Sequence, residues 1–294
     1  MKASHSSQLA HRYRITDGRK FRLQDIDPAD TSSIRKEDAD DALERGVKLL
    51  SEMQEKLYAQ DKWAVLLIFQ AMDAAGKDGT IKHVMSGVNP QGCEVYSFKA
   101  PSAHELDHDF LWRCHQRVPE RGRIGIFNRS YYEETLIVRV HPKFLEAQRL
   151  PQEFLTDDLW QQRFEDIRNF EQYLTRNGVV ILKFFLHVSK EEQRRRFLSR
   201  LEEAEKHWKF SLTDTRERQY WNDYMHAYQE VVRHTATRDA PWYVVPADHK
   251  WFTRLTVAEA IIDKLQSLDL RFPTVDPAKR RELAAARRAL QGEK

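Results

Sequence analysis

The amino-acid sequence predicts an α/β fold with three layers, in which helices cover both faces of a parallel sheet. Helical patterns of ten or more residues alternate with short apolar runs, as they do in βαβ units. The runs are rich in β-branched and aromatic residues, which is typical of strands covered on both faces. We therefore expect a parallel sheet of five strands. They are Trp63 to Phe69, Glu94 to Phe98, Arg123 to Phe127, Val179 to Leu186, and Trp242 to Val245.

Two segments precede the first predicted strand. Residues 1 to 38 are polar and lack a sustained apolar period, so we expect an extended arm. Residues 39 to 60 carry apolar side chains three or four positions apart, which predicts an amphipathic helix. We expect residues 1 to 60 to pack on a core that spans residues 61 to 275.

Helical patterns fill the intervals between and after the strands. The two stretches between the fourth and fifth strands are rich in charged and aromatic residues, and this position predicts a lid over about residues 189 to 237. Residues 276 to 294 are rich in Arg and predict a tail helix. The other predicted helices and the two lid stretches are Ser102 to Gln116, Pro151 to Arg176, Ser189 to Lys209, Thr213 to Thr237, and Phe252 to Leu270.

The composition argues against several classes of protein. The 48 basic and 45 acidic residues give a net charge of only +3, which does not suit a general nucleic-acid coat. No apolar run approaches the roughly 20 residues needed to cross a bilayer, and the N-terminal residues lack the apolar centre of a secretory signal. Cys93 and Cys114 show no CxxC spacing, so neither a disulfide framework nor a zinc site is indicated. We expect a cytoplasmic protein with no membrane or nucleic-acid partner.

The segment Phe69 to Thr80, FQAMDAAGKDGT, links the first predicted strand to a helical pattern. Phosphate-binding loops occur in this context, because small residues let backbone N–H groups surround a phosphate at a helix N-terminus. Ala71 stands where the first glycine of GxxxxGK is expected, and Lys77 supplies a mobile charge. A strand-to-helix turn without function is the alternative. The candidate phosphate-binding residues are Ala74, Ala75, Gly76, Asp78, Gly79 and Thr80.

An acidic residue inside this loop indicates a bound cation. Asp78 follows Lys77, where nucleotide kinases carry a Ser or Thr whose hydroxyl binds magnesium. Asp73 would repel a phosphate unless a cation lay between them, so Asp73 is our candidate ligand for Mg²⁺. The alternative is that Asp73 only caps local N–H groups of the loop.

The third predicted strand is followed by a second group of polar residues. We expect this edge beside the loop, because ligands of such sheets bind at the carboxyl ends of the strands. Asn128 is a candidate magnesium ligand, either directly or through water. Arg129 can bind two phosphate oxygens and neutralise charge that develops during phosphoryl transfer. We expect Glu134 only to stabilise a helix N-terminus, while the role of Glu133 stays open.

Cations of the predicted lid are candidates for binding a polyanion. A polyanion needs many cations, and its binding should weaken with salt. Lys99, near the end of the second strand, is a further candidate. Each arginine alone is more often a solvated charge, and we expect Trp208, Trp221, Tyr224 and Tyr228 to pack rather than to stack on a base. The lid candidates are Arg194, Arg196, Arg200, Lys206 and Lys209.

These motifs together resemble the type-2 polyphosphate kinases, which move phosphate between inorganic polyphosphate and nucleotides. The matching segments are MDAAGKDG, FKAPSAHELDHDFLWR, FNRSYYEE with VRVHP, and RRRFLSRLEEAEKHWKF with YWNDYMHAY. The resemblance implies a P-loop kinase fold like that of thymidylate kinase, magnesium dependence, and a lid over a channel for the phosphate chain. Asp73 and Lys77 match the acidic and basic loop residues of the family, and Arg129 matches its catalytic arginine, so these three are our candidate catalytic residues. NRSYYEE, in place of the commoner DRSWYNR, resembles the branch that accepts AMP and ADP.

The expected function is a reversible, magnesium-dependent phosphotransfer from polyphosphate to AMP or ADP. The preferred acceptor, including guanine nucleotides, and the favoured direction stay open, and we expect a homo-oligomer. A conventional ATP-dependent nucleotide or nucleoside kinase is one alternative, although it does not need many lid arginines. A regulator that binds polyphosphate or nucleotides without turnover is the other.

Overall fold

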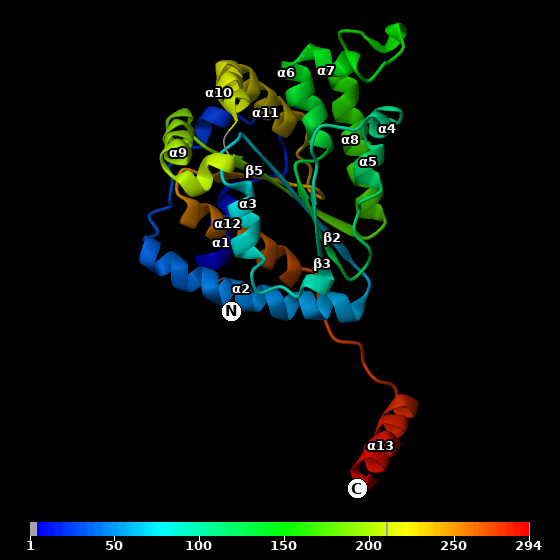
Figure 1. The fold of residues 1–294 in the computed structure, drawn as a ribbon. Coiled ribbons are helices and arrows are strands. Elements are labelled where there is room, and N and C mark those ends of the chain that lie inside the picture. The colour runs from blue at the N-terminus through cyan, green and yellow to red at the C-terminus, as the bar shows by residue number, and fades with distance from the viewer. Residues whose placement is uncertain (1–4, 210, 294) are drawn as a thin grey trace.

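The computed structural model describes residues 5–209 and 211–293, and it is built around a six-stranded sheet (Figure 1). The strand order is β1-β6-β5-β2-β4-β3, and β2 lies between β5 and β4, with which it pairs in parallel. The parallel strands are β2 (Ala64–Ala71), β3 (Cys93–Ser97), β4 (Ile124–Asn128), β5 (Val179–His187) and β6 (Trp242–Pro246). All five predicted runs form these strands.

The expectation of a five-stranded, fully parallel sheet is wrong in one respect. A sixth strand, β1 (Arg14–Ile15), pairs antiparallel with β6 at the edge of the sheet. A strand of two residues is too short to produce an alternating pattern, so this strand could not be predicted from the sequence.

The segment predicted as an extended arm is folded against the body of the protein. It contains α1 (His5–Arg12), β1 and the 3₁₀ helix η1 (Leu23–Asp25). Tyr13 and Leu23 are buried, and a Cβ atom at Gly18 would lie 2.3 Å from the carbonyl oxygen of Val232. This close approach explains why glycine stands at position 18. The arm is therefore part of the packed structure, and its few apolar residues were too scattered to show a period.

Helices cover both faces of the sheet, as expected. On one face of the sheet, α12 contacts β5 and β6 and also packs against α2 and α1. Helix α8 contacts β5 and packs against α11. The helices of ten or more residues are α2 (Lys36–Gln60), α8 (Leu159–Arg176), α9 (Lys190–Glu202), α11 (Trp221–Thr235), α12 (Lys250–Gln266) and α13 (Pro277–Gly292). The shorter ones are α3 (Lys77–Val84), α4 (Ala103–Leu106), α5 (Trp112–His115), α6 (Ile137–Val140), α7 (Pro142–Glu146) and α10 (Leu212–Glu217).

Several predicted helices are interrupted. The stretch Ser102 to Gln116 forms α4 and α5 with a turn between them, in which the Asp109 carboxylate accepts a hydrogen bond from the Leu111 N–H. Short polar side chains that bond nearby backbone compete with the helix in this way. Other 3₁₀ turns are η2 (Pro90–Gly92), η3 (Tyr131–Thr135), η4 (Gln152–Phe154), η5 (Ala204–Lys209) and η6 (Arg218–Tyr220). Of these, η5 forms the end of the first predicted lid helix, and η6 lies inside the second.

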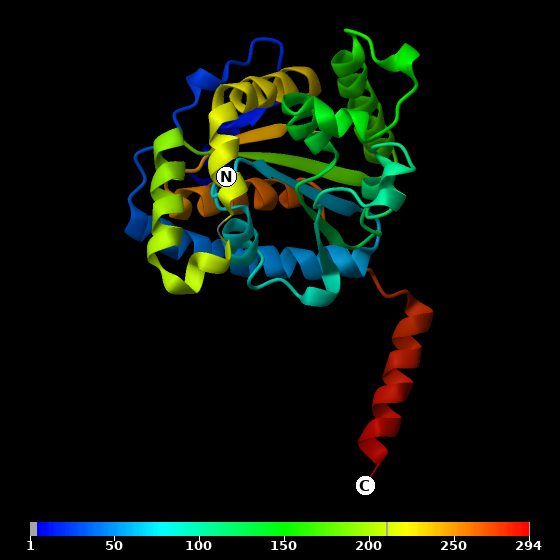
Figure 2. The same ribbon diagram turned by 45° about the horizontal axis from the view of Figure 1, so that its top comes forward.

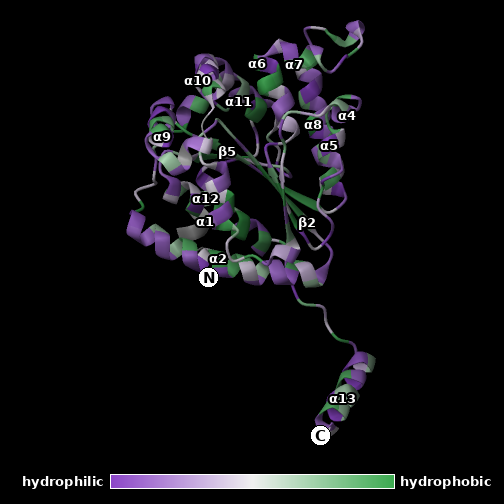
Figure 3. Ribbon diagram, viewed as in Figure 1, coloured by the Kyte–Doolittle hydropathy of each residue, from purple (hydrophilic) through white to green (hydrophobic). Residues whose placement is uncertain are grey.

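The hydrophobic core lies at the sheet, where Figure 3 shows green strands within mostly purple helices. Residues Val65 to Ile68 of β2 are fully buried. One buried ion pair crosses this core: the Lys183 ammonium lies 2.6 Å from a carboxylate oxygen of Glu171, which also accepts hydrogen bonds from Tyr131 and Tyr132. These bonds join β5 and α8 to η3, and so hold η3 against the sheet.

The C-terminal helix stands apart from the rest. Figures 1 and 2 show α13 projecting from the body of the protein, and none of its described residues is buried. Among residues 5–209 and 211–293, no helix is both long enough and apolar enough to cross a membrane.

Candidate active site

The loop between β2 and α3 has the geometry of a phosphate-binding loop. Gly76 immediately precedes α3 with a φ of +108°, a left-handed conformation that suits glycine, and Ala74 also has a positive φ of +61°. The Lys77 ammonium donates a hydrogen bond to the carbonyl oxygen of Ala71 at 2.8 Å. Burial lowers the pKa of Lys77, and the Asp73 carboxylate opposes this effect. The N-terminus of α3 and the Lys77 side chain thus both lie at the loop between β2 and α3.

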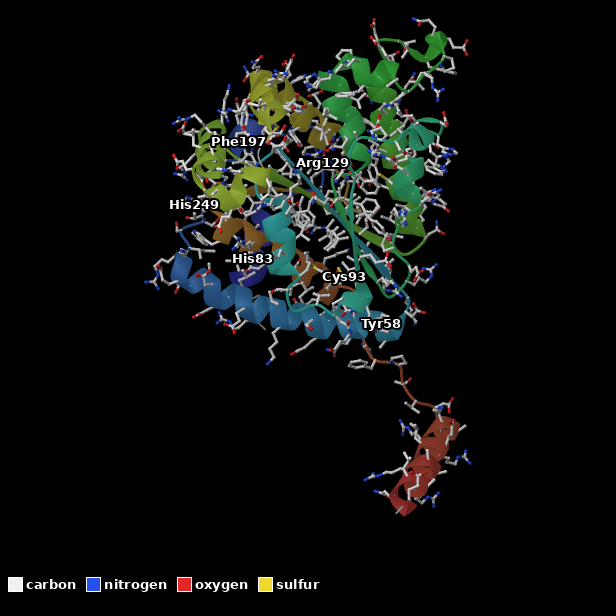
Figure 4. All side chains as sticks on the ribbon, viewed as in Figure 1. Tyr58, His83, Cys93, Arg129, Phe197 and His249 are labelled. Atoms are coloured by element: carbon white, nitrogen blue, oxygen red, sulfur yellow. The ribbon has the colours of Figure 1, made fainter. Side chains whose placement is uncertain are left out.

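Arg129 lies at the end of β4 and reaches this loop, as the sequence predicted. Its own φ is +65°, and its N–H donates to the carbonyl oxygen of Phe69 in β2 at 3.0 Å. Its guanidinium pairs with the Asp73 carboxylate at 3.1 Å. Burial opposes the charge of Arg129, but the carboxylates of Glu133 and Asp73 outweigh it and raise the pKa. Figure 4 places Arg129 between the lid helices and the α6–α7 pair.

Glu133, whose role the sequence left open, lies in η3 beside Arg129. Burial raises the pKa of Glu133, while Arg129 and Lys77 act in the opposite direction. Its neighbour Glu134 instead accepts a hydrogen bond from Gln148 at 2.5 Å and lies 4.0 Å from Arg163. The two acidic residues therefore face different surroundings, and only Glu133 belongs to the site.

The candidate magnesium ligands Asp73 and Asn128 line one cavity of about 370 Å³, together with Lys77, Asp78 and Arg129. We call it the central cavity. The Asn128 amide donates to the Asp78 carboxylate at 2.6 Å, so its carbonyl oxygen is the atom left for a ligand. In the described part of the chain, no three His, Cys, Asp or Glu residues are grouped closely enough to enclose a metal. Hard oxygen donors of this kind suit Mg²⁺ that keeps several water ligands.

A basic cavity of about 500 Å³ lies on one side of the loop. It joins loop residues Ala74, Gly76, Asp78, Gly79 and Thr80 to cations of α9 and α12. The α12 cations, Lys250 and Arg254, were not predicted from the sequence. Their only signal was a spacing of four along a helix. The cations are Arg195, Arg196, Arg200, Lys250 and Arg254.

Arg196 lines this cavity but differs from the expectation, because all five of its N–H groups are engaged within the protein. Its Nε donates to Glu192, and its two terminal nitrogens donate to the carbonyl oxygens of Ala74, Ala75, Ala247 and Asp248 at 2.6 to 3.0 Å. The side chain is only 8% exposed. Arg196 therefore joins the phosphate-binding loop to the turn between β6 and α12, and it has no donor left for a phosphate chain.

Other predicted cations occupy different places. Arg194 pairs with Glu191 and does not line the cavities described for this edge of the sheet. Lys99 is exposed and is absent from these cavities too. Arg200 lines both the basic and the central cavity, 3.7 Å from Asp214. The side chains of Lys206 and Lys209 lie outside the described residues.

An aromatic cavity of about 330 Å³ lies on the other side of Asp73. Glu217 of α10 accepts hydrogen bonds from His141 at 2.8 Å and from Tyr224 at 2.7 Å, which joins the lid to the α6–α7 corner. Burial, followed by the charge of Asp73, raises the pKa of Asp214. The principal lining side chains are Asp73, Arg129, Glu133, His141, Lys143, Phe144, Asp214, Glu217, Tyr224 and Tyr228.

The aromatic residues of the lid behave in two ways. Trp221, Tyr224 and Tyr228 are buried in the core, as predicted. Trp208 is 79% exposed, so the prediction that it packs is wrong, and it lines the central cavity. Tyr224 and Tyr228 pack and line the aromatic cavity at the same time.

A mostly parallel sheet covered by helices, with a small-residue loop between a central strand and a helix and with an arginine from the adjacent strand facing that loop, is typical of P-loop proteins. The family model of polyphosphate kinase 2 matches residues 33–273. The chain belongs to this family, which confirms the resemblance found in the sequence.

Related proteins and a solved structure agree with this assignment. The chain is 53% identical over 283 residues to an ADP-polyphosphate phosphotransferase of Rhodopseudomonas palustris, covering 95% of this chain and 97% of the relative. It is 44% identical over 269 residues to an AMP/ADP-polyphosphate phosphotransferase of Meiothermus ruber, covering 91% and 97%. The crystal structure of polyphosphate kinase 2 from Arthrobacter aurescens is 39% identical, with a TM-score of 0.85, and the match covers 95% of this chain and 96% of that one.

Proposed function

We propose that the protein transfers phosphate reversibly between inorganic polyphosphate and adenine nucleotides, forming ADP from AMP and ATP from ADP. The observation that carries this proposal is the position of Lys77, Asp73 and Arg129 in a central cavity between a basic and an aromatic one. The names of the relatives from R. palustris and M. ruber support the donor and the acceptors.

The two outer cavities suit different substrates. The basic cavity brings several cations to the loop, which suits a chain of phosphates. The aromatic cavity combines Phe144, Tyr224 and His141 with carboxylates, which suits a base and a ribose better than a long polyanion. We infer that the phosphate chain lies along α9 and α12, and that the acceptor nucleotide lies below α10.

Phosphoryl transfer asks mainly for positioning and charge neutralisation. Lys77 and Arg129 would bind oxygens of the transferred group. To do so, the Arg129 guanidinium would give up its ion pair with Asp73 and pair with the phosphate instead. The helix N-terminus of α3 would orient the donor. Magnesium, held by Asp73 and the Asn128 carbonyl oxygen, would supply positive charge between the phosphates.

The segment from α9 to α11 would act as a lid that excludes water, which would otherwise accept the phosphate. The contacts of Glu217 with His141 and Tyr224 support this role, because they close α10 over the aromatic cavity. We also propose that the fold is like that of thymidylate kinase. We further propose that the kinase core begins after residue 60 and ends at residue 275. The homo-oligomer and the cytoplasmic location stay predictions.

The direct test is to supply ADP and purified polyphosphate as the only phosphate donor, with Mg²⁺, and to measure ATP. We expect ATP in proportion to the enzyme, and none when polyphosphate is left out. If no ATP forms although the protein retains polyphosphate in a binding assay, the protein is a regulator and the proposal fails. If only ATP serves as donor, the protein is a conventional kinase. Parallel reactions with AMP, ADP and GDP identify the acceptor.

A further inference from the structure

One side of α9 is hydrogen-bonded to the backbone of the loop between β2 and α3. Gln193 donates to the carbonyl oxygen of Asp73 at 2.9 Å. Arg196, further along α9, donates to the carbonyl oxygens of Ala74 at 3.0 Å and of Ala75 at 2.7 Å. Two side chains of one helix therefore hold three successive carbonyl oxygens of the loop. We call this pair of side chains the carbonyl clamp.

Both side chains of the carbonyl clamp are buried and are fixed by further hydrogen bonds. Gln193 is 1% exposed, and its Oε1 atom accepts a hydrogen bond from Arg218 at 2.7 Å. Arg196 also donates to the carbonyl oxygens of Ala247 and Asp248, at 2.6 and 3.0 Å. Because Ala247 and Asp248 directly follow β6, the carbonyl clamp connects the loop to the central sheet.

The carbonyl clamp determines the direction of two N–H groups of the loop. In a planar trans peptide unit, the C=O and N–H bonds point in opposite directions. Holding the Asp73 carbonyl oxygen on α9 therefore directs the Ala74 N–H away from the clamp, and holding the Ala75 carbonyl oxygen does the same for the Gly76 N–H. Within the part of the chain that the structure describes, neither N–H group donates to a protein acceptor. Since Ala74 and Gly76 both line the central cavity, these two donors are left for an anion.

The loop conformation is unfavourable for Ala74 unless its neighbours support it. Its φ of +61° lies in the left-handed region, which residues other than glycine rarely adopt because of the Cβ atom. Gln193 holds the peptide group before Ala74, and Arg196 holds the one after it. The carbonyl clamp thus stabilises this conformation before a substrate binds. Donors that are oriented in advance are what the stabilisation of developing charge requires.

We propose that Gln193 and Arg196 are positioning residues, which orient the N–H groups of Ala74 and Gly76 toward the phosphate that Lys77 would bind. This role rests on the proposed phosphotransfer, and it gives neither side chain of the carbonyl clamp a contact with substrate. It therefore differs from the expectation drawn from the sequence, in which Arg196 itself binds the phosphate chain.

The first test removes one bond of the carbonyl clamp. Gln193→Met keeps the length of the side chain but loses the donor to Asp73. The matched control is Gln229→Met, since Gln229 also bonds one backbone group, the Leu23 N–H at 3.0 Å, but in the N-terminal arm. With ADP as acceptor, kcat/KM for polyphosphate should be about fivefold lower in Gln193→Met, which corresponds to one hydrogen bond of about 1 kcal/mol. Gln229→Met should lower only the melting temperature.

A second substitution separates positioning from a general loss of stability. Glycine adopts a positive φ without steric cost, so Ala74→Gly makes the loop less dependent on the carbonyl clamp. In this background, Gln193→Met should lower kcat/KM only about twofold. If Gln193 merely stabilises α9, the loss is the same in both backgrounds, and the proposal is overturned.

Arg196→Lys tests the other half of the carbonyl clamp. Lysine keeps the positive charge, but its donors share one nitrogen, whereas those of arginine are spread over a planar group. We expect kcat/KM for polyphosphate to fall about tenfold, with a smaller loss in the Ala74→Gly background. If Arg196 instead bound polyphosphate by its charge, lysine would retain most of the rate, and this result would overturn the proposal. The melting temperature shows whether the variant is folded.

Failure of the carbonyl clamp can be distinguished from failure of the proposed function. A wild-type protein that forms no ATP refutes the phosphotransfer. The same variants are then compared by titration calorimetry of the full chain with purified polyphosphate, in which Gln193→Met and Arg196→Lys should bind more weakly than wild type and Gln229→Met should not. If wild type forms ATP and the clamp variants match it, only the role of the clamp is refuted.

Discussion

Two cavities flank the phosphate-binding loop, and they differ in charge and in the kind of surface they offer. The basic cavity has five lining cations from α9 and α12 against two carboxylates, those of Asp78 and Glu192. The aromatic cavity has two cations, Arg129 and Lys143, against four carboxylates. A long polyanion is therefore attracted to the first and repelled by the second. This difference supports the proposed assignment of the polymeric donor to the basic cavity and of the nucleotide to the aromatic cavity.

The largest effect is expected at Lys77, which lines the central cavity that adjoins the other two. Lys77→Ala removes the positive charge that would stabilise the transferred phosphate, so kcat should fall about 100-fold or more. ATP formation from ADP and polyphosphate is the measurement, and the melting temperature shows whether the variant is folded. Lys82→Ala, exposed on the same helix, should retain the rate. Equal losses in both variants would mean that Lys77 acts only through the stability of α3.

A second substitution tests whether the aromatic cavity binds the nucleotide. Phe144→Ala removes a ring of the aromatic cavity, and loss of base stacking is worth on the order of 1 to 3 kcal/mol. Since Phe144 is 39% exposed, we expect the smaller effect, a rise of about fivefold in the KM for the nucleotide. The KM for polyphosphate should not change. Phe154→Ala, in η4 and outside the cavity, is the matched control. If polyphosphate binding weakens instead, the substrates are assigned to the wrong cavities.

The corresponding change on the basic side is Arg254→Ala. Arg254 comes close to the loop, since one of its nitrogens lies 3.9 Å from the position of a Cβ atom at Gly79. The KM for polyphosphate should rise about threefold, because a partly exposed charge contact is worth less than a buried one. Arg194→Ala, whose side chain is paired with Glu191, should have almost no effect. Steady-state rates at several salt concentrations test the assignment. A higher nucleotide KM in Arg254→Ala would contradict it.

The smallest effect concerns stability rather than catalysis. Because burial raises the pKa of Glu133 above its ordinary value of 4.5, the folded protein holds this proton more tightly than the unfolded chain does. The resulting stabilisation is present below pH 4.5 and is lost as the pH rises through the raised pKa. Relative to wild type, Glu133→Gln should therefore gain free energy of unfolding between pH 5 and pH 8.

Urea unfolding at the two pH values measures this difference. Glu146→Gln, at an exposed position of α7, is the control. A gap between Glu133→Gln and wild type that stays constant with pH would show that Glu133 titrates normally. It would also remove the distinction between the half-buried carboxylate of Glu133 and the carboxylates at the surface.

The sequence by itself determined the parallel strands, the strand-to-helix loop before Lys77 and the family. Each has a local signal: a continuous apolar run, small residues before Lys77, and motifs in a fixed order. It also placed Asn128 and Arg129 beside the loop, because parallel strands end at one edge of a sheet.

Only the tertiary structure decided which cations face the loop. Arg196 and Arg200 lie on the same helix and look equivalent in sequence, yet Arg196 is fixed by carbonyl oxygens while Arg200 lines two cavities. Lys250 and Arg254 reach the loop from α12, far away in the chain. The arm, too, is held in place by contacts with distant segments, among them α11, α12 and β6. The direction of a side chain and the backbone atoms it meets depend on packing between distant segments, which no local pattern encodes.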